Sequence, residues 1–159
     1  MPAAKTPIFS LLQPLRQQQT QLHLGTGLHT LGLCRWVLEQ TDAAHIMLTT
    51  FSTSEEFLCG FHRLRRDGLV IDAVLIADIK AARKTVHLDA LVRNCFDSVE
   101  LLPNHSKVVL ISNDAWQVTI LTSQNQTYGD RIEQTLISTD RDIFNQTFNQ
   151  LFSHLAHGT

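Results

Sequence analysis

The sequence predicts an α/β domain in which a mixed β-sheet is layered with helices that flank it. Short segments rich in apolar and β-branched residues alternate with segments whose apolar residues recur at helical spacing, and the connections are short. The chain has 159 residues, which is enough for one domain to bury a substantial core. An apolar share of 43% and a charged share of 18% are typical of a folded globular protein rather than a disordered one.

Charge and cysteine content narrow the class of protein further. The formal net charge is −2, so no overall basic field attracts nucleic acid, although a local basic cleft is compatible with this value. Cys34, Cys59 and Cys95 are far apart and odd in number, which fits neither a zinc site nor a disulfide framework. We expect free thiols, buried in a protein of a reducing compartment. No segment has the length of a membrane span or the apolar core of a signal peptide, so we expect a cytoplasmic protein that does not bind membranes.

The N-terminal part differs in composition from the rest of the chain. Residues 1–19 are rich in Pro and Gln and are expected to form an arm, whose patch over residues 8–12 docks on the domain or on a partner. The domain itself is predicted over residues 20–159. Residues 20–24 alternate as in a strand and end at Gly25-Thr26-Gly27. These glycines are a weak signal for a phosphate loop, and a tight turn before a helix is the better interpretation.

The remaining elements follow from periodicity and from capping residues. Further strands are predicted over residues 44–50, 70–76, 98–102, 105–111, 116–121 and 134–138. Helices are predicted over residues 28–39, from Thr53 or Ser54 to near Asp67, over residues 83–94, and after a cap at Thr139 or Asp140. No internal repeat is visible.

Polar residues gather in one stretch, from Pro103 to Glu133. Side chains alternate along a strand, so His105 and Lys107 are expected on the same face. The next strand leads to Ser123 and Asn125, which are again two residues apart. An imidazole, an ammonium, a hydroxyl and an amide at the ends of neighbouring strands form a plausible oxyanion site.

These groups suit the cleavage of a phosphodiester, whose negative charge repels nucleophiles. A neutral histidine can attack phosphorus while cationic and amide donors hold the phosphoryl oxygens. The attacking nitrogen of His105 stays free only if its other ring nitrogen is held, and Glu133 is the nearest downstream glutamate that can hold it. The alternative is a purely structural role, in which Lys107 only extends from a strand end into solvent and Asn125 only shapes the following loop.

The arrangement resembles the phospholipase D superfamily, whose signature is H-x-K, four residues, D, then G-S-x-N and a later glutamate. His105-Ser106-Lys107 matches the first part, and Thr122-Ser123-Gln124-Asn125 matches the second with Thr in place of Gly. The resemblance extends from about Thr20 to the terminal helix, and it is to the short, single-motif, nuclease-like members, including those found in bacteriophage genomes. Ser112 stands where the family has the aspartate, which puts a supporting contact in doubt, and Thr122 is expected to narrow the pocket.

The resemblance implies a phospholipase D-like fold and a nuclease-like phosphodiesterase that cleaves DNA or RNA through a covalent phosphohistidine. It implies catalytic roles for His105, Lys107, Asn125 and Glu133, substrate binding by Ser123, and neither a metal nor a cofactor. Family enzymes use two copies of the motif and this chain has one, so activity requires a homodimer. The alternative is a weak or inactive module of the same fold that binds nucleic acid or a protein partner. Lipase activity is less favoured, because only the patch over residues 8–12 suits a membrane surface.

Overall fold

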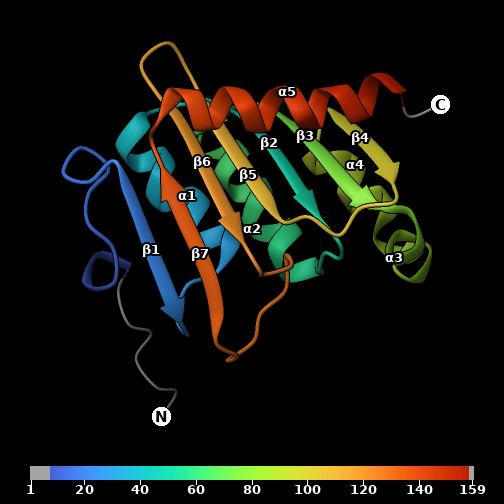
Figure 1. Ribbon diagram of the computed structural model, residues 1–159. Helices are drawn as coiled ribbons and strands as arrows, with labels where there is room; N and C mark the ends of the chain where they lie inside the picture. The colour runs from blue at the N-terminus through green and yellow to red at the C-terminus, as the bar shows by residue number, and fades with distance from the viewer. Residues whose placement is uncertain (1–7, 158–159) are drawn as a thin grey trace.

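The computed structural model describes the backbone of residues 8–157 and the side chains as far as residue 155. Its centre is a seven-stranded mixed sheet with the order β1-β7-β6-β5-β2-β3-β4 (Figure 1). Strands β2, β3 and β4 are parallel to one another, and every other neighbouring pair is antiparallel. The predicted α/β class with a mixed sheet is therefore confirmed. The strands are β1 (Thr20–Gly25), β2 (Ala44–Thr50), β3 (Val70–Asp78), β4 (Ser98–Leu102), β5 (Val108–Ser112), β6 (Gln117–Thr122) and β7 (Glu133–Ser138).

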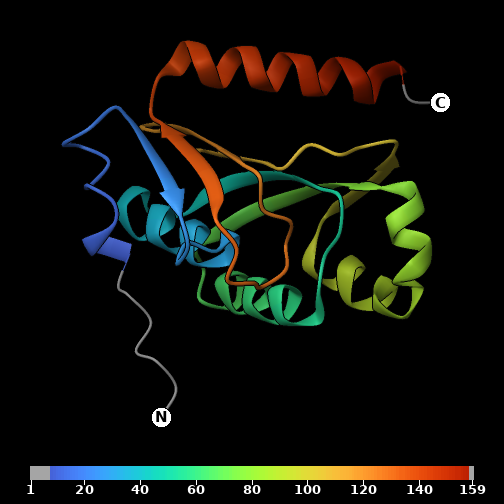
Figure 2. The ribbon, with the colours of Figure 1, turned by 60° about the horizontal axis from the view of Figure 1, so that its bottom comes forward.

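Helices cover the two faces of the sheet unequally. Figure 2 shows α5 alone on one face, with the other α-helices on the opposite face. The helices are α1 (Thr30–Thr41), α2 (Glu55–Arg66), α3 (Ile79–Lys84), α4 (Asp89–Cys95) and α5 (Arg141–His157), with short 3₁₀ helices η1 (Ile8–Ser10) and η2 (Val86–Leu88). The main core fills the α1–α2 side, where the rings of Phe57, Phe61 and Phe96 are stacked in series. A smaller cluster under α5 contains Val108 and Phe144.

This topology brings one set of strand ends to a common edge. Strands β1, β2, β3, β4 and β6 end at the lower edge of the sheet in Figure 1, and β5 and β7 begin there. The stretch before β5, the loop between β6 and β7, and the segments after β2 and β3 consequently meet. That edge carries the predicted site.

Two predicted elements begin more than two residues away from where the structure begins them. The helix expected over residues 83–94 begins at Ile79 instead, because Asp78 accepts hydrogen bonds from the backbone N–H groups of Lys80 and Ala81. It is interrupted at Thr85 and resumes as η2 and α4. The strand expected from His105 begins only at Val108, because hydrogen bonds within residues 104–106 take the place of ladder bonds.

The N-terminal segment and the cysteines contribute to the core. Leu12 and Leu15 are buried within it, and Ile8 packs against it, whereas residues 1–7 lie outside the described part. Cys34 and Cys95 are buried free thiols, and burial raises their pKa values to about 12 and about 11 respectively. Cys59 is free and half-buried. Within residues 8–157 no helix combines the length and the apolar character that crossing a bilayer requires.

Candidate active site

The imidazole of His105 and the ammonium of Lys107 meet in front of β5. Lys107 Nζ lies 3.1 Å from His105 Nδ1, and because an ammonium only donates, Nδ1 accepts. The two side chains therefore share a face, as the spacing predicts. His105 is exposed and Lys107 is half-buried, so both groups are accessible at the sheet edge. The ring of His105 also contacts the ring of Phe51, with 5.0 Å between centroids.

The segment that carries His105 is held by Asn104. The backbone N–H of Asn104 donates to Asp78 Oδ1 over 3.0 Å, and its side-chain amide donates to the carbonyl of Thr50 over 3.0 Å. Asn104 Oδ1 also accepts from the backbone N–H and the hydroxyl of Ser106. The residue before the histidine is thus tied to the ends of both β2 and β3. Sequence reasoning missed Asn104, although the turn-forming sequence Pro103-Asn104 was a signal for it.

The carboxylate of Asp78 serves two elements. It caps α3 and accepts from Asn104, and these backbone donors, the N–H of Asn104 first, lower the pKa of Asp78 below its ordinary value of 3.8. Asp78 is 6% exposed. The negative charge of this buried carboxylate is therefore maintained by N–H groups on both sides, which fixes the loop under His105 to the start of α3.

Asn125 is oriented by the segment after β2. Its Oδ1 accepts from the backbone N–H groups of Phe51 and Ser52, over 3.3 and 3.4 Å. This arrangement settles which end of the amide is the acceptor. Its Nδ2 group has no acceptor among the described residues, so both of its N–H donors are available to an anion.

Ser123 and Glu133 form a pair on the loop between β6 and β7. The hydroxyl of Ser123 donates to the carboxylate of Glu133 and accepts from the backbone N–H of Gln134 over 3.0 Å. Arg131 lines the same small hollow as Ser123, Asn125 and Glu133, and it supplies a second cation that sequence reasoning missed.

The expected bond between Glu133 and His105 is not formed. Among the described residues, Glu133 contacts Ser123 by hydrogen bond, and no hydrogen bond or ion pair joins it to the imidazole. The reason is geometric: Glu133 begins β7, and β6 lies between β7 and β5 in the sheet. The structure brings His105 together with Lys107, and Ser123 together with Glu133, as two neighbouring pairs.

The two departures from the family signature lie in different places. Ser112 is at the opposite end of β5, about 17 Å along the strand from Lys107, and pairs with His45 and Gln117. It therefore supports nothing at the site edge. Thr122 is near the site, and its hydroxyl is used inside the sheet, where it contacts Gln134 and Thr135.

Hollows open on both faces of the sheet around this edge. Toward α5, a groove of about 800 Å³ is lined by His105, Leu121 and α5, and a second of about 430 Å³ by Lys107, Leu24 and Leu121. Toward α3 and α4, a cavity of about 330 Å³ begins at Phe51. His105, Lys107 and Phe51 thus each line one of these three hollows. An extended ligand bound at His105 therefore has room on both faces of the sheet.

Comparison with known proteins identifies the fold. No model of a known protein family matches the sequence, and no curated protein matches it either. Solved structures do match, and two of them are members of the phospholipase D superfamily. Polyphosphate kinase from Porphyromonas gingivalis superposes with a TM-score of 0.65 at 16% identity, over 93% of this chain and 27% of that one. NucT from Helicobacter pylori superposes with a TM-score of 0.60 at 14% identity, over 86% of this chain and 96% of that one.

A third similar structure is that of TrmBL2, an archaeal chromatin protein described as having a novel mode of DNA binding. Its TM-score is 0.56 at 9% identity, and the match covers 94% of this chain and 56% of that one. The chain thus spans about a quarter of the polyphosphate kinase, about half of TrmBL2 and nearly all of NucT. At these identities the likeness concerns the fold.

Proposed function

The chain has the fold of the phospholipase D superfamily, and from this premise we propose that it is a phosphodiesterase that cleaves nucleic acid with His105 as the nucleophile. The observation that carries the proposal is the placement of His105, Lys107 and Asn125 at one exposed edge. The ammonium of Lys107 there faces a neutral ring, and the amide N–H donors of Asn125 meet no acceptor among the described residues. Such donors match the oxygens of a phosphoryl group. The likeness of fold to NucT, which covers 86% of this chain and 96% of that one, supports the same choice.

The contacts of His105 define what must change when substrate binds. With Nδ1 accepting from Lys107, a neutral imidazole carries its proton on Nε2 and cannot attack from that atom. A phosphate is a stronger acceptor for Lys107 than an imidazole is, so substrate draws the ammonium away from Nδ1. The proton then resides on Nδ1, and Nε2 becomes the nucleophile.

The proposed reaction has two steps and passes through a covalent intermediate on His105. A ring nitrogen of His105 forms a bond to phosphorus, the bond from phosphorus to the leaving oxygen breaks, and a second imidazole gives its proton to that oxygen. Water then attacks the phosphohistidine, the nitrogen–phosphorus bond breaks, and the second imidazole takes the proton of the water. Lys107 and Asn125 hold the phosphoryl oxygens throughout.

The second imidazole is assigned to another copy of the chain. The groove beside Lys107 is lined by Leu22, Leu24 and Leu121, which are 71%, 72% and 38% exposed. Apolar side chains this exposed next to an anion site indicate a surface that a partner covers. In a twofold dimer that uses this groove, both copies of His105 lie close to the axis and face one cleft.

The central test is the loss of cleavage in His105→Ala. We expect the rate on a labelled oligonucleotide to fall by roughly 10⁴-fold or more. His62→Ala, which removes an exposed histidine on α2, is the matched control and should keep full activity. A denaturing quench at alkaline pH followed by intact-mass measurement should detect a nucleotide fragment bound to the wild type and absent from His105→Ala. Cleavage by His105→Ala at the wild-type rate would refute the assignment.

The dimer is tested separately with Leu24→Glu. This change places a charge in the apolar groove at an exposed position, so it should dissociate the dimer without unfolding the chain. Sedimentation should then report a monomer, and cleavage should be lost with it. Ile71→Glu alters a side chain that is 53% exposed on β3, and it serves as the control. A monomer that cleaves as fast as the wild type would exclude the shared cleft.

A binding module without catalysis is the second candidate. The Lys107–His105 bond favours it, because the imidazole in that state donates from Nε2 and does not attack. Under this alternative His105→Ala changes the affinity for an oligonucleotide, and no cleavage products or covalent fragment form with the wild type.

A further inference from the structure

A cavity on the helical side of the sheet adjoins the proposed phosphate site. It has a volume of about 330 Å³ and lies between β3 and β4 on one side and α3, η2 and α4 on the other. Most of its walls are apolar, and they include Leu75, Ala77, Val92, Val99 and Leu101. A cavity of this size and character can enclose a planar organic group. The mechanism proposed above makes no use of it.

Phe51 connects this cavity to the site. Its ring contacts the imidazole of His105, and Phe51 is also one of the residues that line the cavity. The backbone N–H groups of Phe51 and of the adjacent Ser52 orient Asn125. A group bonded to a phosphate at His105 therefore lies close to Phe51, which is shared by the site and the cavity.

The polar features of the cavity favour a nucleobase over a purely apolar group. The hydroxyl oxygen of Thr53 is buried at the wall and has no hydrogen-bond partner among the described residues. Such an atom suits a ligand that has both an apolar face and a polar edge. The carboxylate of Asp89, also at the wall, is already paired with Arg93 over 3.0 Å.

Three cations lie on α3, the helix that forms part of the cavity wall. Arg83 lines the cavity, and Lys80 and Lys84 are exposed on the same short helix. None of the three forms an ion pair with a carboxylate within residues 8–155. An acyl chain would leave them unused, whereas the next phosphates of a nucleic acid strand would meet them.

We propose that this cavity binds an unpaired nucleobase next to the phosphate held at His105, with the cations of α3 contacting the following phosphates. The proposal rests on the proposed function in that it takes nucleic acid as the ligand of the site. Aromatic rings bind bases by stacking, and a base must be unpaired to enter such a cavity. Single strands are therefore the expected ligand, and a duplex of the same sequence binds more weakly.

The test measures binding of two probes to the cleavage-deficient His105→Ala chain. One probe is a short single-stranded oligonucleotide, and the other is an abasic strand with the same sugar–phosphate backbone. We expect the intact strand to bind about tenfold more tightly. Phe51→Leu, which keeps an apolar side chain and removes the ring, should weaken the intact strand by a similar factor and leave the abasic strand unaffected. Phe9→Leu, at a ring that is 78% exposed and distant in the chain, is the control.

Two further variants keep the test informative if Phe51→Leu destabilises the fold. Val86 is 71% exposed and lines the cavity, so Val86→Asn should weaken only the intact strand without affecting folding. Arg83→Gln should weaken both strands and reduce the salt dependence by about one phosphate contact. A base effect and a phosphate effect are thus measured independently.

The outcomes separate this inference from the proposed function. Equal binding of intact and abasic strands, or equal weakening of both by Phe51→Leu, overturns the base cavity even if the wild type cleaves. Competition by a short-chain phosphatidylcholine that Phe51→Leu abolishes would assign the cavity to an acyl chain instead, and it also overturns the inference. If the wild type does not cleave but the difference between probes and its loss in Phe51→Leu persist, the phosphodiesterase fails and the base cavity stands.

Discussion

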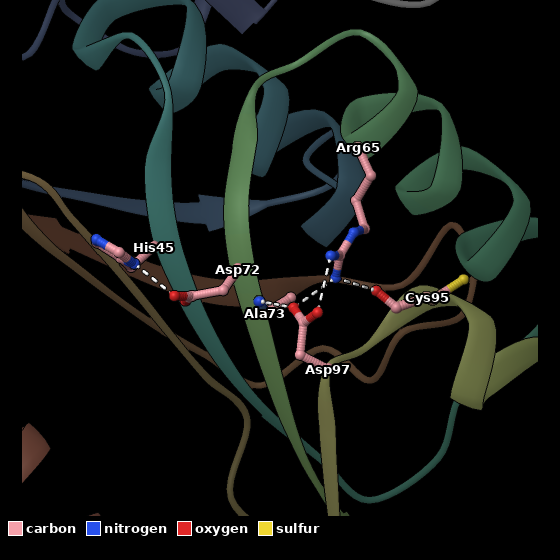
Figure 3. A network of polar contacts seen from close by, with 6 residues as sticks. All are labelled: His45, Arg65, Asp72, Ala73, Cys95 and Asp97. Carbon is pink, nitrogen blue, oxygen red and sulfur yellow. Dashed lines mark hydrogen bonds and ion pairs between the residues drawn. The ribbon is translucent and has the colours of Figure 1, made fainter.

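The polar groups at the two edges of the sheet differ in whether they have hydrogen-bond and ion-pair partners within the described chain. At the edge where β2 and β3 begin, Arg65 donates to both carboxylate oxygens of Asp97 and to the carbonyl of Cys95 (Figure 3). Asp97 also accepts from the backbone N–H of Ala73 over 2.8 Å, and His45 and Asp72 pair over 2.8 Å nearby. Each charged group drawn there has a partner of opposite or complementary character.

At the other edge, the ammonium of Lys107 faces an imidazole, and the amide donors of Asn125 meet no acceptor in the part of the chain that the structure describes. An ammonium held by a neutral ring is a poorer match than one held by a carboxylate. A polar group used for structure thus finds its partner within the chain, whereas a group used for binding retains unused donors. Arg65 and Lys107 illustrate the two cases.

The largest expected effect that separates the edges is that of Lys107→Met. Loss of a cation that stabilises transition-state charge should reduce cleavage by roughly 10²- to 10³-fold. The free energy of unfolding should change by less than about 0.5 kcal/mol, because no carboxylate within residues 8–155 pairs with Lys107. Single-turnover rates and urea unfolding measure the two quantities, with Arg66→Met at the exposed end of α2 as the control. A large loss of stability would show that the groups at this edge are structural.

At the opposite edge, Asp97→Ala should affect stability and leave activity intact. The change removes two charge-assisted bonds to Arg65 and leaves the backbone N–H of Ala73 without its acceptor. Because the Asp97 side chain is 50% exposed, we expect a loss of only about 1 to 2 kcal/mol in urea unfolding. Glu100→Ala, at an exposed carboxylate on β4, should cost less. Slower cleavage by Asp97→Ala under conditions where this variant is fully folded would contradict the separation of the two edges.

Acid should reduce the contribution of Asp97 to the free energy of unfolding in a defined pH range. The hydrogen bonds from Arg65, followed by the N–H of Ala73, lower the pKa of Asp97 below its ordinary value of 3.8. A carboxyl whose pKa is lowered in the folded state stabilises that state at pH values above its ordinary pKa. This contribution to the free energy of unfolding disappears as the pH falls through the folded-state pKa. The stability difference between the wild type and Asp97→Asn should thus be constant near neutrality and shrink below pH 3.8. A difference that grows in acid would refute the assignment.

The smallest expected effect is that of His45→Ala. The pair of His45 and Asp72 is about half exposed on both sides, so solvent screens it. We expect the free energy of unfolding to change by less than about 0.5 kcal/mol, with no change in cleavage. Thermal unfolding at low and high salt gives the measurement. A loss comparable to that of Asp97→Ala would show that the pair belongs to the same cooperative network.

The fold class, most of the strands and the pairing of His105 with Lys107 could be predicted from the amino-acid sequence. These depend on short-range rules: alternation along a strand, helical spacing and capping residues such as Asp140, which accepts from the first N–H groups of α5. Spacing within the motif was enough to place His105 and Lys107 on the same face, because only one residue separates them.

Only the tertiary structure decided which groups from distant segments meet. Asn104 reaches Asp78 and Thr50, and Asn125 reaches Phe51, across 26, 54 and 74 residues of sequence. The order of the sheet places β6 between His105 and Glu133, so the expected contact between them is replaced by the bond of Glu133 to Ser123. Strand order is a property of the whole chain, and no local pattern of residues encodes it.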